Sequence, residues 1–431
     1  MSANGESEKT HLPALDGLRG LAILLVLSMH LSEDFWYIPL PWRKIMEVFF
    51  CGWTGIDLFF VLSGFLITGI LWESRSAHHY FRNFYARRTL RLFPLYYTTL
   101  IVAFLIIPHI VPLLEHRTAV LSEVAGQLRL SETAAGYWYW YVAYCANILL
   151  GTKGLMFPGQ FWSLSVEEHF YLVWPLLVYR LSHRTLVKVT GWIIVGTFIV
   201  RCCLFHFVIP YGMFCLTPCR TDGLAMGAMI ALVMRNENGL ETLKRFTRRA
   251  GPWILAACAA LYLGQKGILH QYGLIQQTIG YTVTPAAFAC LLILALTHEP
   301  TKRFFSGRLL RFFGKYSYAI YVINPFVIYY IKPLFSRGNV QNYSIVTTTL
   351  LGSHAPAIAP AWLLDTLDSS GRVTAVLGTT VLLSMMSWRL IEQPCLKLKK
   401  YFPYERRHPA SGAELLTALA EGSGANAPEH E

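Results

Sequence analysis

The sequence predicts an all-α polytopic membrane protein with about ten transmembrane helices. Hydrophobic residues make up 54% of its 431 residues and charged residues only 14%, whereas roughly a quarter of the residues in soluble domains are charged. The apolar runs are continuous rather than alternating, which excludes a transmembrane β-barrel. Ten runs have a length suited to spanning helices, and they lie near 12–32, 50–72, 92–114, 161–180, 187–208, 216–235, 251–265, 275–297, 313–333 and 372–392.

Basic residues are distributed unequally between the loops that join these runs. With the N-terminus inside, 23 Lys and Arg fall in one set of loops and eight in the opposite set. Such an excess marks the cytoplasmic side of a membrane protein, so both termini are predicted to be cytoplasmic. The net charge of +12 is therefore a feature of topology, and no nucleic-acid partner is expected.

The domain organisation follows from the same pattern. We expect residues 1–11 to form a short cytoplasmic segment, residues 12–395 a single membrane domain, and residues 396–431 a cytoplasmic tail that is first basic and then disordered. The nine cysteines show no Cys/His spacing typical of a zinc site. No metal is therefore expected.

The first apolar run carries two ionisable residues, Arg19 and His30. Ionisable side chains are costly inside a membrane, which makes them candidates for function. The two residues are 11 positions apart, so they share one helical face and lie roughly 16 Å apart along the axis. A cation and a neutral base at two depths of one groove suit a long donor that bears phosphates. Alternatively, Arg19 extends to the membrane interface and His30 marks the end of the span.

The second and third runs add glycines, a carboxylate and an arginine pair. Gly55 and Gly64 allow close helix approach, and Asp57 is a carboxylate of the buried type. Arg88 and Arg91 are three positions apart and share a helical face. Such a pair can bind phosphate oxygens bidentately, or it can anchor the helix at anionic lipid headgroups.

Two adjacent glutamates, Glu167 and Glu168, lie near the start of the run 161–180. Adjacent helix positions diverge by about 100°, so at most one of them faces a given pocket. We expect His30 at a comparable depth, and a carboxylate beside a neutral imidazole orients its tautomer and stabilises the imidazolium. Glu167, with Glu168 as second choice, is therefore the predicted partner of His30. The alternative is that both glutamates are hydrated at the interface.

In this order, the motifs resemble those of the acyltransferase-3 family of bacterial integral membrane O-acyltransferases. The resemblance covers roughly residues 12–395. The matching segments are, in chain order, Arg19 to His30 as an Arg-x10-His signature, 55–65, Arg88-x-x-Arg91, 162–168, 220–227, 314–321 and 387–394.

The resemblance implies a multi-pass enzyme of the bacterial inner membrane. Members move acyl groups, often acetyl from acetyl-CoA, onto hydroxyls of extracytoplasmic carbohydrates or similar acceptors, and no permanently bound cofactor is implied. Arg19, Arg88 and Arg91 would bind the phosphates of acyl-CoA. His30 would act as a base, or as a nucleophile through a short-lived acyl-imidazole, and Glu167 would orient it.

One residue departs from the family pattern, because Asn324 stands where members commonly have His. An amide is no base at neutral pH, so the role of that His is either dispensable or altered here. A rival interpretation is a proton-coupled transporter or exporter whose buried charges form a relay. Transporters usually show internal pseudo-repeats, and the sequence shows none. A non-catalytic lipid-binding scaffold would leave so many intramembrane charges unexplained.

Overall fold

The computed structural model describes residues 12–32, 48–114, 135–154, 158–205, 207–265, 272–330 and 361–404. These residues form an all-helical structure without strands, in which most backbone hydrogen-bonding groups are paired within their own helix. In this part of the chain six helices are long and apolar enough to cross a membrane. The predicted class, an all-α polytopic membrane protein, is confirmed. The six candidate spans are Pro13–Leu31, Cys51–Glu73, Tyr80–Ile110, His183–Leu204, Gln276–Thr297 and Ser369–Tyr401.

Each of the ten predicted runs overlaps a helix. Three helices, which begin at Tyr80, Gly239 and Ala361, start eleven or twelve residues before their apolar runs. In chain order the helices are α1 (Pro13–Ser32), η2 (Val48–Thr54), α3 (Gly55–Glu73), α4 (Tyr80–Ile101), η3 (Val102–Ile106), α5 (Ile107–Leu114), α7 (Trp138–Val142), α8 (Ala146–Lys153), α9 (Phe161–Arg180), α10 (His183–Leu204), α11 (Pro210–Cys215), η4 (Thr217–Cys219), α12 (Thr221–Val233), α13 (Gly239–Gly264), η5 (Gln276–Gly280), α14 (Tyr281–Thr297), α15 (Glu299–Phe305), α16 (Arg308–Tyr330), α19 (Ala361–Ser387), η7 (Trp388–Glu392), α20 (Gln393–Lys397) and η8 (Leu398–Tyr401).

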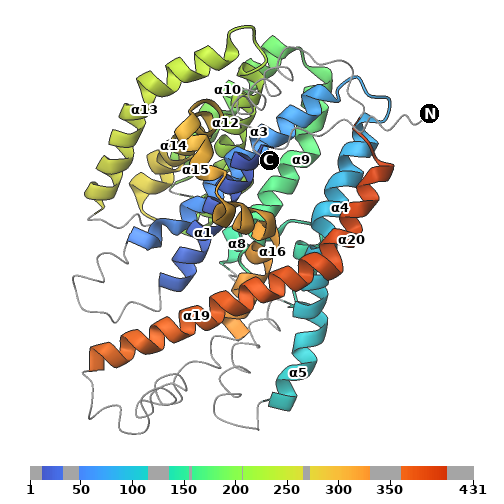
Figure 1. The fold of residues 1–431 in the computed structure, drawn as a ribbon, viewed down its shortest axis with the longest axis vertical. Helices are drawn as coiled ribbons and strands as arrows, with labels where there is room; N and C mark the ends of the chain where they lie inside the picture. Colours follow the sequence, from blue (N-terminus) through green and yellow to red (C-terminus); the bar gives the residue numbers. More distant parts are fainter. Residues whose placement is uncertain are drawn as a thin grey trace, which may run out of the picture.

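Helix α1 lies in the interior, packed against α16, η2 and α3 (Figure 1). Its crossing with α16 requires glycine, because a Cβ on Gly314 would collide with the backbone carbonyl of Asp16. The crossing of α3 and α12 is equally close, since a Cβ on Gly64 would collide with the carbonyl of Leu224. The expected close approach at Gly64 is therefore confirmed.

The C-terminal helices fold back onto α4. Helix α19 runs along one side of the molecule and leads to α20, which lies beside α4 (Figure 1). Arg87 on α4 donates hydrogen bonds to the carbonyl oxygens of Lys399 and Phe402, both at 3.0 Å. The predicted tail thus begins with a segment that is held against the bundle. Of the predicted end segments, 1–11 and 405–431 lie outside the described residues.

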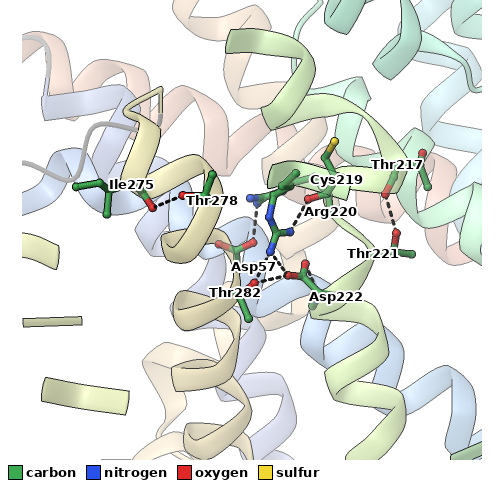
Figure 2. Close-up of polar contacts among 11 residues, drawn as sticks. Asp57, Thr217, Cys219, Arg220, Thr221, Asp222, Ile275, Thr278 and Thr282 are labelled. Atoms are coloured by element: carbon green, nitrogen blue, oxygen red, sulfur yellow. Dashed lines mark hydrogen bonds and ion pairs between the residues drawn. The ribbon is translucent and has the colours of Figure 1, made fainter. Parts of the chain in front are cut away.

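Two buried ion pairs join α3, α10 and α12. Arg220, just before α12, donates to Asp57 of α3 at 2.6 Å, and Arg201 of α10 donates to Asp222 of α12 at 2.8 Å. All four side chains are at most 3% exposed. The Arg220 guanidinium also lies 4.2 Å from the ring centre of Tyr281, a cation–π contact. Figure 2 shows Asp57, Arg220 and Asp222 converging between the helices.

Candidate active site

Three cavities lie in a row along α1. The one at the C-terminal end of α1, which we name the His30 cavity, has a volume of about 220 Å³. The next, the central cavity, measures about 90 Å³ and shares Tyr321 with the first. The third, the cation cavity, measures about 660 Å³ and shares Arg19, Arg91 and Tyr318 with the central cavity.

The cation cavity gathers positive charge from α1, α4 and α16. Two of its basic residues are Arg19 of α1 and Arg91 of α4. Helix α16 supplies three more, because helix positions three, four and seven apart share one face. Only two carboxylates line it, and one of these, Asp16, already accepts a hydrogen bond from Arg19 at 3.1 Å. The excess of cations favours a ligand with several negative charges. The residues from α16 are Arg308, Arg311 and Lys315.

The central cavity places Glu167 among hydrogen-bond donors and cations. Its Oε1 accepts a hydrogen bond from Ser63 at 2.9 Å, and its Oε2 accepts one from Tyr171 at 2.8 Å. Arg88 lies 4.7 Å from the ring centre of Tyr171, and both Arg88 and Arg91 line the same cavity. The carboxylate therefore has a fixed orientation beside two guanidinium groups.

His30, which lines the His30 cavity, is hydrogen-bonded to Asn324. The Nδ1 of His30 lies 2.9 Å from Oδ1 of Asn324, whose Nδ2 donates to Thr380 at 3.3 Å. An amide oxygen only accepts, so this contact requires the proton of the neutral imidazole on Nδ1. The lone pair is then on Nε2. A histidine in this tautomer can accept a proton at Nε2.

Aromatic rings form much of the wall of the His30 cavity. They present flat apolar faces beside the imidazole, a surface suited to stacking on the faces of a ring-shaped ligand. Two of these rings, Trp162 and Phe214, also surround Arg220 at 5.7 and 5.4 Å. The buried ion pair thus supports this wall. The rings that line the cavity are Trp53, Trp162, Tyr211, Phe214, Tyr272, Tyr321 and Tyr329.

The predicted pairing of Glu167 with His30 differs from the hydrogen bonds that the described residues form. The hydrogen bonds of Glu167 go to Ser63 and Tyr171, and His30 is paired with Asn324 instead. The reason is depth. Glu167 lies in the central cavity, which is nearer the N-terminal end of α1 than the His30 cavity. Glu168 lines none of the three cavities, and in the described part of the chain its Oε1 is buried without a hydrogen-bond partner.

The remaining predicted residues occupy two adjoining cavities. Arg19, Arg88 and Arg91 meet Glu167 in the central cavity, and two of them continue into the cation cavity. The basic residues of α16 were interpreted as topological, although their spacing already indicated a shared face. Nothing in the local sequence around Asn324 indicated contact with His30, because 294 positions separate the two. Among the residues described, no three metal-binding side chains gather.

The family model and the similar proteins both indicate an acyltransferase family. The model of an acyltransferase domain, Acyl_transf_3, matches residues 12–386. A putative peptidoglycan O-acetyltransferase, YrhL of Bacillus subtilis, is 26% identical over 362 residues, which is 79% of this chain and 52% of that protein. The O-acetyltransferase OatA of Staphylococcus aureus is 25% identical over 372 residues, 79% of this chain and 54% of that protein.

A third relative matches a shorter stretch more closely. The peptidoglycan O-acetyltransferase OatA of Listeria monocytogenes is 33% identical over 177 residues, which is 40% of this chain and 25% of that protein. The chain spans about half the length of the curated relatives that it matches over most of its own length. No solved structure matches it.

Proposed function

The chain belongs to the acyltransferase family whose domain model covers residues 12–386, and from this membership we propose that it is a membrane O-acyltransferase. It transfers an acyl group, acetyl by preference, from cytoplasmic acyl-CoA to a hydroxyl of an extracytoplasmic carbohydrate. Its place is the bacterial inner membrane, with about ten spans and both termini in the cytoplasm. The observation that carries the proposal is the row of cavities along α1.

The two ends of this row suit the two ends of an acyl-CoA. The cation cavity offers five basic side chains to phosphates, while the His30 cavity offers a base. Arg19 and His30 are separated by roughly 16 Å at 1.5 Å per residue, so the donor must be extended. The pantetheine arm would cross the central cavity, beside Arg88 and Glu167, and bring its thioester to His30.

In the direct route, Nε2 of His30 takes the proton of the acceptor hydroxyl. The hydroxyl oxygen forms a bond to the thioester carbonyl carbon, the carbon–sulfur bond breaks, and the CoA sulfur leaves and receives the proton. In the two-step route, Nε2 itself forms the bond to the acyl carbon, the carbon–sulfur bond breaks, and CoA leaves as the thiolate. The acceptor oxygen then bonds to the acyl carbon, the bond from that carbon to Nε2 breaks, and the hydroxyl proton goes to the CoA sulfur. In both routes Asn324 acts by keeping the proton on Nδ1.

The acceptor that we propose is a glycan, and peptidoglycan is the first to test because the relatives are named for it. The aromatic wall of the His30 cavity supports a sugar ring held against the imidazole. Purified protein should move labelled acetyl from acetyl-CoA onto soluble peptidoglycan fragments. If another glycan is labelled and these fragments are not, the acceptor assignment is wrong while the reaction class holds.

Arg88→Ala and Arg91→Ala should each weaken acetyl-CoA binding. A charge-assisted contact to phosphate is worth about 1.5–3 kcal/mol, so the affinity should fall by roughly one to two decades. Calorimetric titration of the purified protein with acetyl-CoA measures this loss. Membrane orientation should be retained, because the other basic clusters remain.

The matched control is Arg82→Ala on the same helix. This arginine is exposed, and among the described residues it donates to Asn83 alone, at 3.3 Å. Its removal therefore deletes the same charge outside the cavities. Affinity for acetyl-CoA should change less than twofold, since exposed pairs contribute about 0–1 kcal/mol. An unchanged affinity in all three variants, with an altered dependence on anionic lipid, would instead assign Arg88 and Arg91 to lipid headgroups.

Asn324→Leu should lower kcat by about ten- to a hundredfold, because a misplaced base loses its productive geometry. Donor affinity should stay unchanged, since Asn324 does not line the cation cavity. Asn324→His should recover activity to within about tenfold of wild type, because a ring nitrogen can again accept from Nδ1–H. Steady-state kinetics of both variants test this. Equal losses in both would show that the site needs the shape of the amide rather than an acceptor.

A further inference from the structure

Trp388 and Glu392 line the cation cavity, but neither is basic, so neither binds a phosphate through its charge. Both belong to η7, a single turn of π-helix that interrupts the long C-terminal helix. Such turns are rare and often occur at functional sites. The fold of α20 against α4 brings this turn to the cavity, so its two side chains meet Arg91 there.

Glu392 is an unexpected neighbour for a phosphate. It is only 4% exposed, and its Oε1 accepts one long hydrogen bond, 3.4 Å, from Ser387. In the described residues it forms no ion pair, although five cations line the same cavity. A buried carboxylate is costly, and it repels a nearby phosphate. A part of the ligand that donates hydrogen bonds would satisfy it.

Trp388 offers a ring on the same turn. Its indole is half-buried, Lys315 lies 5.6 Å from its ring centre, and Tyr316 packs edge-on at 6.0 Å. An aromatic face beside several cations is the combination that binds a base together with its phosphates. A carboxylate next to it can accept a hydrogen bond from a ribose hydroxyl or an exocyclic amino group, as acidic residues do in dinucleotide sites.

We infer that Trp388 and Glu392 recognise the nucleoside part of the donor. The base stacks on Trp388, and Glu392 accepts a hydrogen bond from the base or the ribose, while the basic residues hold the phosphates. This inference rests on the proposed function, because it assigns the cation cavity to acyl-CoA. It makes both residues determinants of donor specificity, remote from the reacting thioester.

The test compares a complete donor with a truncated one. Acetyl-CoA contains the nucleotide, whereas S-acetyl-4′-phosphopantetheine lacks it. Glu392→Gln and Trp388→Leu should each lower kcat/KM for acetyl-CoA by about tenfold and leave kcat/KM for the truncated donor within twofold. Glu299→Gln, which alters an exposed glutamate paired with Lys302, should change neither value.

Other results would overturn the inference. If Glu392 merely neutralises the surrounding cations, Glu392→Gln should raise the affinity for both donors, because it removes a negative charge beside the phosphates. Equal losses with both donors would mark a structural role. Competition by adenosine 3′,5′-bisphosphate against a labelled donor provides a readout independent of turnover, and its affinity should fall tenfold in both variants. If wild type binds this probe but transfers no acyl group, the proposed function fails while the nucleoside site stands.

Discussion

His30→Ala should abolish acyl transfer while leaving expression and membrane insertion intact. Removing a general base typically costs about 10²–10⁴-fold in rate, and removing a nucleophile costs more. The residue lines a cavity at one end of α1, and its Nδ1 is held by Asn324 at 2.9 Å. The loss should therefore appear in kcat, with acetyl-CoA affinity unchanged, since the phosphates are bound at the opposite end of the row.

The matched control for this variant is His78→Ala. His78 is exposed, and its Nδ1 lies 3.2 Å from Nδ1 of His79, its one hydrogen-bond contact within the described part of the chain. Transfer should therefore be unaffected. Turnover assays with equal amounts of folded protein measure both variants. If a folded His30→Ala protein turned over at the wild-type rate, His30 would be neither the base nor the nucleophile.

Asp57→Ala should destabilise the fold more than any other single change considered. The substitution leaves the Arg220 guanidinium buried without its carboxylate, and breaking a buried pair in this way costs about 3–5 kcal/mol. Two guanidinium nitrogens of Arg220 already lack hydrogen-bond partners in the described residues, so few alternatives exist. Denaturant unfolding in detergent, followed by circular dichroism, measures the change in free energy of unfolding.

A double variant separates charge from packing. Asp57→Leu combined with Arg220→Met removes both charges, and such replacements are often neutral or stabilising. Most of the lost stability should return. We also expect Asp57→Ala to lower acyl transfer, because Trp162 and Phe214 surround Arg220 and line the His30 cavity. A loss below about 1 kcal/mol in Asp57→Ala would show that this pair contributes little to stability.

Sequence reasoning was most successful where a pattern repeats along one helix. Long apolar runs predicted the helices, and the 11-residue spacing placed Arg19 and His30 on a common face that the row of cavities follows. The three-residue spacing of Arg88 and Arg91 likewise brought both to the central cavity. These features depend on helical geometry alone, which the chain fixes locally.

Contacts between distant helices could not be predicted from residue spacing along a single helix. Asn324, on α16, is a hydrogen-bond partner of His30, and whether Asn324 or Glu167 reaches His30 depends on how far α9 and α16 are shifted along α1. A shift of one helical turn changes depth by about 5.4 Å, and the spacing along one helix does not fix such a shift. The basic residues of α16 were assigned to topology for a related reason, because charge counts contain no information on which helix faces which cavity.

We propose that this protein moves an acyl group from CoA to a hydroxyl of an extracytoplasmic acceptor through His30. The most direct measurement is mass spectrometry of peptidoglycan fragments after incubation with purified protein in vesicles and isotopically labelled acetyl-CoA. We predict a labelled acetyl ester on the fragments with wild-type protein and none with His30→Ala. If wild-type protein adds no acyl mass increment to any glycan offered, from acetyl-, propionyl- or succinyl-CoA, acyl transfer is ruled out and transport is favoured.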